Sequence, residues 1–350
     1  MSRLATLALV CLALSTAAAA QSRDIPKTRS GRPDLSGTYD VSTLTPMERP
    51  AELGEKMALT DEEAAELAER TRQAMALANR DSDPNRGAPP QGGDGSPGAS
   101  GNVGGYNAFW IDPGEGAFQI DGQWRTSILI DPPNGRYPPR VEGANTGRGG
   151  GRANDGTAYW LEAGVDAPGP YDDMEQRPYA ERCILSFGST SGPPMLPSLY
   201  NNHKRIVQGE DTVLILIEMV HDARIVRMNA EHDPPEIKKW LGDSIGWWEG
   251  DTLVVDTTNL YDKNSFTNRY GATPHMRLVE RFTRVDAETL IYEFTVEDSA
   301  TWTRPWTVEV PMAKSEDKLW EFACHEGNYG MDGILAGHRA EERDAARARR

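Results

Sequence analysis

Residues 277–296 read RLVERFTRVDAETLIYEFTV, and this stretch decides the fold class. Apolar and polar side chains alternate over Arg277–Val285 and again over Thr289–Val296, which is typical of strands with one buried face. Asp286–Ala287–Glu288 lies between the two runs as a short polar turn. The stretch therefore predicts an antiparallel β-hairpin.

The same pattern recurs outward from this hairpin. Further strand pairs joined by short turns are expected at Thr212–Val220 with Arg224–Met228, Trp247–Trp248 with Thr252–Thr258, and Trp306–Met312 with Leu319–Cys324. Consecutive short strands of this kind predict a mainly β fold. We expect an antiparallel meander that closes into a lipocalin-like barrel, because closure removes unpaired strand edges. A twisted β-sandwich is the alternative.

Residues 1–20 predict a cleavable secretory signal peptide. Arg3 precedes an apolar run, Leu4–Leu14, and small residues follow at Ala17–Ala20. The run is shorter than the roughly 20 apolar residues that span a bilayer. We expect cleavage near Ala20, a periplasmic or secreted chain, and no membrane insertion afterwards; a retained anchor is the alternative.

The mature chain divides into three parts. Residues 21–104 predict an extended N-terminal segment with one helix at about 60–80, where Thr60 and Glu63 match a capping box, followed by a disordered Gly/Pro-rich loop. Residues 105–338 predict the β-rich domain, interrupted by a second Gly-rich loop, and residues 339–350 a charged C-terminal tail, helical or frayed.

Charge and cysteine content limit the partners and the compartment. The net charge is −16, which argues against a nucleic acid partner and against binding to anionic lipid. Cys11 leaves with the signal peptide, so Cys183 and Cys324 remain as either one disulfide or two buried thiols. Nothing in the composition determines the oligomeric state.

The first candidate site is the turn Glu218–Arg224. Glu218, His221 and Asp222 are acid–base candidates there, because imidazole and carboxylate groups exchange protons near neutral pH. Arg224 is a candidate for holding an anionic or carbonyl group of a ligand. The alternative is a solvated surface turn with an Asp–Arg ion pair.

The second candidate is Cys324–Gly330, which reads CHEGNYG. His325 and Tyr329 are acid–base candidates, and Glu326 and Asn328 are ligand-binding candidates, since flanking glycines permit close approach. The chain has no His-x-x-x-His or Cys-x-x-Cys spacing, so we expect no cofactor; a metal ion held by His221, Asp222, His325 and Glu326 is the alternative.

A third candidate combines aromatic and polar side chains. Asn107, Trp110 and Arg125 suit stacking on a sugar or aromatic ring, with a core patch that anchors the long loops as the alternative. Other histidines, such as His203 and His232, lack distinctive neighbours and are expected at the surface.

Several motifs resemble those of a secreted bacterial family of uncharacterised proteins. They are Gly31–Gly37 (GRPDLSG), Gly246–Val255 (GWWEGDTLVV) with Thr257–Asn259 (TTN), and Cys324–Met331 (CHEGNYGM). The resemblance covers most of the mature chain and implies secretion, but it implies no particular activity.

Together these patterns favour a secreted or periplasmic enzyme. It would perform acid–base chemistry of the lyase, isomerase or hydrolase type on a small sugar-like or aromatic ligand in a barrel pocket. The alternatives are a non-catalytic lipocalin-like protein that binds a small molecule and a structural protein of the cell envelope.

Overall fold

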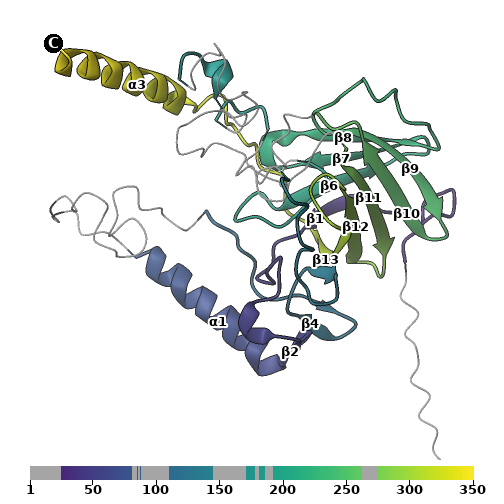
Figure 1. Cartoon of the computed structure of the whole chain (residues 1–350). Helices are drawn as coiled ribbons and strands as arrows, with labels where there is room; N and C mark the ends of the chain where they lie inside the picture. Colours follow the sequence, from purple (N-terminus) through teal and green to yellow (C-terminus); the bar gives the residue numbers. More distant parts are fainter. Residues whose placement is uncertain are drawn as a thin grey trace, which may run out of the picture.

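The computed structural model describes residues 25–80, 85, 87, 110–144, 171–177, 181–185, 192–261 and 275–350. Within these residues the chain is mainly β, with a closed barrel of nine strands as its body (Figure 1). The barrel strands are β1 (Gly37–Asp40), β6 (His203–Gln208), β7 (Thr212–Ile217), β8 (Ala223–Met228), β9 (Asp243–Glu249), β10 (Thr252–Thr258), β11 (Arg277–Arg284), β12 (Thr289–Glu297) and β13 (Trp306–Ser315).

The barrel closes where β1 pairs with both β6 and β13. The hairpin at residues 277–296 is present as β11 and β12, and Tyr292 lies opposite Phe282 in its register. A further strand, β5 (Leu129–Asp131), pairs with the start of β13 outside the ring. The expected mainly β barrel is therefore confirmed.

One joint in the barrel differs from an antiparallel meander. Strands β8 and β9 run parallel, with Val226 opposite Ser244, and residues 229–242 carry the chain back between them. Gly246 lies at this joint, where an added Cβ would come within 2.8 Å of the Val226 side chain. The missing side chain lets the two strands pack closely.

Alternation along the strands places the core inside the barrel. Leu290, Tyr292, Phe294 and Val296 of β12 are all buried, as are the alternate residues of β13 from Trp306. Residues 192–196 are buried as well. The Met195 N–H donates to the Tyr292 hydroxyl at 3.1 Å, so this segment packs against the core of the barrel.

The N-terminal helix is confirmed as α1 (Asp61–Ala78). Thr60 caps it through the Glu63 N–H, and the Glu63 carboxylate accepts from the Thr60 N–H in return. Beside α1 lies a small sheet of β2 (Ala58–Leu59), β4 (Gln123–Arg125) and β3 (Gln119–Ile120) (Figure 1). Short 3₁₀ turns complete the elements: η1 (Ala51–Leu53), η3 (Met174–Gln176) and η4 (Met219–His221).

Two local expectations are wrong. Leu319–Cys324 is not a strand, because β13 continues to Ser315 and finds its second partner in β1. The second is the antiparallel meander, because β8 and β9 are paired in parallel. The expected C-terminal tail is the second half of α3 (Tyr329–Ala348), which projects away from the barrel (Figure 1).

The expected disulfide is present. Cys183 and Cys324 are bonded across a sequence separation of 141 residues. The predicted signal peptide (1–20) and most of both Gly-rich loops lie outside the described residues. No helix in the described part of the chain has both the length and the apolar character needed to cross a membrane.

Candidate functional site

The first candidate turn lies at one end of the barrel. His203 opens β6, β7 ends at Ile217, and β8 begins at Ala223, so three neighbouring strand ends meet there. The register places Lys204 opposite Ile217 and Leu216 opposite Ala223. We call the group formed by His203, Glu218, His221 and Asp222 the barrel-end site.

The connection between β7 and β8 is strained. Val220 and His221 both have positive φ, at 62° and 47°. This region is particularly unfavourable for a β-branched residue, and each such position costs of order 1–3 kcal/mol. The turn is held by the Ile217 N–H, which donates to the Asp222 carbonyl at 2.9 Å, and by the buried Val220 side chain. Strain of this kind is concentrated at functional sites in proteins.

Asp222 carries an unusual carboxylate. Its Oδ2 is buried and has no hydrogen-bond partner among the described residues. Burial raises the pKa of Asp222 to about 6, against a smaller lowering by the nearby His221. A carboxyl group with this pKa binds and releases a proton close to neutral pH, as an acid–base catalyst requires.

Glu218 has a different environment from Asp222. Its carboxylate is buried and lies 3.5 Å from His203 Nδ1, and its Oε1 accepts a hydrogen bond from the Trp320 N–H at 2.8 Å. Burial alone would raise the pKa of Glu218, but the hydrogen bonds from His203 and Trp320 outweigh it and lower the pKa. The same contact with Glu218 raises the pKa of His203. Glu218 is therefore an ionised anchor for two other segments.

Arg224 points into the barrel rather than toward its mouth. Its guanidinium pairs with the Glu280 carboxylate through both terminal nitrogens, and the Tyr292 hydroxyl donates to the same carboxylate at 2.6 Å. Both charged groups are buried. With its two terminal nitrogens engaged by Glu280, Arg224 has a structural role in this arrangement.

Trp110, from the third candidate, lies beside residues 199–202, which directly precede His203 of the barrel-end site. Its ring packs against Tyr200 at 5.0 Å between centroids. The Asp112 N–H donates to the Leu199 carbonyl at 2.7 Å, and Asn202 donates to the Asp112 carbonyl at 2.9 Å. These bonds fix Trp110 beside the residues just before His203.

The other two members of that candidate are not part of this site. Arg125 pairs with Glu309, on the outward side of β13, at 3.1 Å. Asn107 lies outside the described residues.

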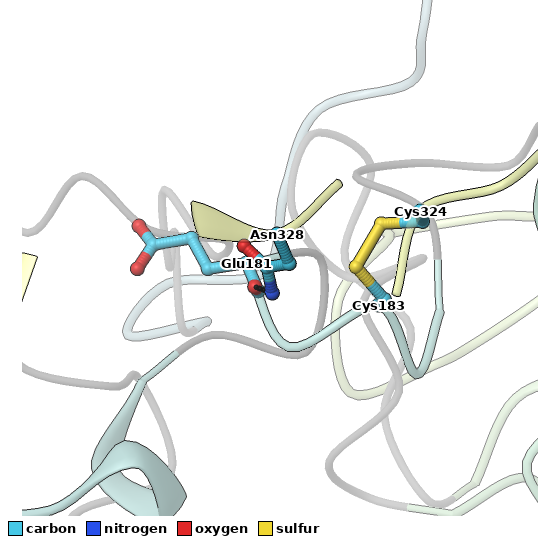
Figure 2. The surroundings of a disulfide bond; sticks show 4 residues. All are labelled: Glu181, Cys183, Cys324 and Asn328. Carbon is cyan, nitrogen blue, oxygen red and sulfur yellow. Dashed lines mark hydrogen bonds between the residues drawn. A yellow bond between two sulfur atoms is a disulfide. The ribbon is translucent and has the colours of Figure 1, made fainter. Parts of the chain in front are cut away.

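Two residues of the CHEGNYG motif, Cys324 and Asn328, join it to another segment of the chain. Figure 2 shows the Cys183–Cys324 disulfide with Asn328, which donates from its side chain to the Glu181 carbonyl at 2.8 Å. His325 and Glu326 are exposed, and neither side chain hydrogen-bonds to another described residue. Tyr329 is 82% exposed at the start of α3. The disulfide and the Asn328 hydrogen bond together hold this motif against residues 181–183.

A second charged cluster forms around His232, which sequence reasoning placed at the surface without a role. His232 Nδ1 lies 3.0 Å from the buried Asp243 carboxylate, and its Nε2 lies 3.6 Å from Asp256. Lys239 and Arg227 also bind Asp243. Burial alone would raise the pKa of Asp243, but the hydrogen bonds from Lys239, the Asp233 N–H and His232 outweigh it and lower the pKa. The parallel joint creates this cluster by bringing residues 229–242 back over β9, and no local sequence motif signals it.

The chain was also compared with known proteins. No model of a protein family matches it, and no curated protein is similar to it. Within the described residues, no group of three or more His, Cys, Asp or Glu side chains is arranged to hold a metal ion.

Proposed function

We propose that this chain is a secreted or periplasmic enzyme that performs acid–base chemistry on a small sugar-like or aromatic ligand at the barrel-end site. The observation that carries the proposal is the buried Asp222 oxygen, which lacks a partner on a strained turn. A buried polar group without a partner costs free energy and needs an explanation. An incoming ligand hydroxyl or a transferred proton would supply one.

The surroundings of Asp222 suit this role. His221 is exposed beside it and provides an imidazole, the side chain that most often transfers protons in enzymes. The Glu218–His203 pair fixes the adjoining strand ends, and Trp110 with Tyr200 offers an aromatic surface nearby. Large side chains such as Trp306 and Tyr292 occupy the barrel interior, which favours a ligand at the end of the barrel over one at its centre.

The disulfide supports the proposed location. Such bonds form and persist in oxidising compartments, including the periplasm and the exterior of the cell. A lyase, an isomerase or a hydrolase would each use a proton donor and acceptor of this kind. A hydrolase is the first case to test, because chromogenic substrates carry both a sugar ring and an aromatic ring.

The test compares the wild type with Asp222→Asn on a panel of p-nitrophenyl glycosides. Nitrophenolate release measures turnover, and calorimetric titration with the matching phenyl glycosides measures binding. We expect the variant to bind as the wild type does and to lose about 100-fold or more of its turnover, a typical contribution of a general acid–base group. Asp251→Asn, in the exposed turn at the opposite end of the barrel, is the matched control.

Other outcomes would point elsewhere. Equal turnover in Asp222→Asn and wild type would refute the role of Asp222. Binding without turnover in every variant would favour the non-catalytic ligand-binding barrel. Neither binding nor turnover across the panel would favour a structural role in the cell envelope.

A further inference from the structure

Residues 316–324 pass over the barrel-end site without forming a strand. We call this segment the strap. Trp320 lies in its middle with 76% of its surface exposed, the most exposed of the described tryptophans. Its ring has no contact with the ring of another described residue. An indole left in water forgoes the free energy of burying its apolar surface, so this exposure calls for a reason.

The backbone of the strap is fixed although the indole is free. The Trp320 N–H donates to the buried Glu218 carboxylate, and two residues later Phe322 packs against the core. Cys324 then ends the strap in the disulfide to Cys183. An exposed aromatic residue on a fixed backbone binds a ligand without first losing conformational freedom.

The start of the strap is joined to the same site. The Ser315 hydroxyl lies 3.2 Å from His203 Nε2 and accepts a hydrogen bond from the Asp317 N–H. His203 Nε2 therefore lies beside Ser315, the residue before the strap, and 3.9 Å from the Asp317 carboxylate within the strap, while His203 Nδ1 lies beside Glu218. The Trp320 backbone, Glu218 and His203 thus belong to one hydrogen-bonded unit, and the Trp110–Tyr200 pair adjoins it through the residues before His203.

We propose that Trp320 is the ring-stacking residue of the barrel-end site, and that its ligand is a small molecule with a flat or apolar ring face. A pyranose and an aryl group both present such a face to an indole. The proposal rests on the proposed function only for the location of the site. It assigns recognition to Trp320 and leaves proton transfer to Asp222.

The experiment follows the Trp320 ring directly. The protein is labelled with 5-fluorotryptophan, and Trp320→Phe assigns the ¹⁹F resonance of that residue among the nine tryptophans of the sequence. The probes are methyl β-D-glucoside, benzyl alcohol and phenyl β-D-glucoside, which carry a sugar ring, an aromatic ring and both. We expect the Trp320 resonance to shift saturably with at least one probe.

Affinities of the variants complete the test. Trp320→Ala should raise the Kd of the probe that binds by about tenfold, and Trp320→Phe by less, because a smaller ring still stacks. Trp247→Ala, an outward residue of β9 whose indole bonds Glu249, should leave the Kd within about twofold and is the matched control.

The outcomes separate this inference from the proposed function. A probe that binds while the Trp320 resonance stays fixed, or while Trp320→Ala keeps its affinity, overturns the inference. So does the absence of binding by all three probes at millimolar concentration. A shifted Trp320 resonance and weaker binding by Trp320→Ala, with no turnover by the wild type, would uphold the inference and refute the enzyme.

Discussion

Replacing Glu280 by Gln should strongly destabilise the barrel. Two bonds from Arg224 and one from Tyr292 converge on the Glu280 carboxylate, inside the barrel and out of contact with water. The Gln side chain has nearly the same shape but leaves the Arg224 charge without a counter-ion. Its amide hydrogens would also face the guanidinium donors. Removing one partner of a buried pair costs about 3–5 kcal/mol, and we expect a loss in that range.

The double variant Arg224→Met/Glu280→Leu should behave quite differently. It removes both charges, and with them the cost of taking two ions out of water. Replacing a whole buried pair with apolar residues is often neutral or stabilising by about 1–4 kcal/mol. We therefore expect the double variant to be far more stable than Glu280→Gln. The free energies of unfolding of Arg224→Met, Glu280→Leu and the double variant, each relative to the wild type, then give the coupling between the two residues.

Urea unfolding, followed by both tryptophan fluorescence and far-UV circular dichroism, measures these free energies. Coincident transitions with unchanged m values are required for the comparison. If Glu280→Gln lowered the free energy of unfolding by less than about 1 kcal/mol, the reasoning would be refuted. A buried guanidinium without a counter-ion should lower it by more than that. Arg224 would then have another way to satisfy its charge, and its predicted role in ligand binding would regain support.

Three further outcomes follow from the same contacts. The folded-state pKa of Asp222, about 6, exceeds its unfolded value, so its stabilising contribution is complete below the unfolded pKa and is lost as the pH rises through about 6. At pH 8 the wild-type carboxyl is ionised although burial disfavours the charge, so Asp222→Asn should raise the free energy of unfolding by up to about 3 kcal/mol. At pH 3.5 the carboxyl is protonated, and the variant should change the free energy of unfolding by almost nothing. Urea titrations at both pH values measure the two differences. Glu218→Gln should lower the pKa of His203 in an NMR titration of its ring protons, because the contact with Glu218 raises that pKa; an unchanged value would contradict the assignment. Cys183→Ser/Cys324→Ser should lose about 5 kcal/mol by the loop-entropy relation, measured by urea unfolding of the oxidised wild type and the variant, and a loss below about 1 kcal/mol would mean that the loop is already constrained when unfolded.

Much of the barrel could be predicted because alternation is a local property. The hairpin of β11 and β12 is visible in residues 277–296, and the Thr60–Glu63 capping box marks the start of α1. Alternation shows which face of a strand is buried, but it does not show which strand lies beside it. The parallel joint between β8 and β9 therefore escaped prediction, as did the charged cluster around His232 that it creates.

The candidate site was predicted in part. A polar turn after β7 pointed to Glu218 and Asp222, yet His203 and Trp320 reach Glu218 from 15 and 102 residues away. Those contacts depend on tertiary packing and leave no local pattern. Arg224 was predicted to hold a group of the ligand, but it shares the buried face of β8 with Val226 and Met228 and pairs with Glu280 inside the barrel.

The closed barrel explains why chemistry would concentrate at its end. Strand pairing satisfies the backbone groups of the barrel wall, and large side chains occupy its interior. The carboxylate without a partner lies in a connection, where the surrounding barrel supplies enough stability to hold a strained turn. The unpartnered Asp222 carboxylate could serve catalysis, or it could be a packing defect that the barrel tolerates. The variant Asp222→Asn distinguishes these two explanations. A variant that gains stability and loses turnover shows that the strain serves catalysis, whereas one that gains stability and keeps all turnover shows that it does not.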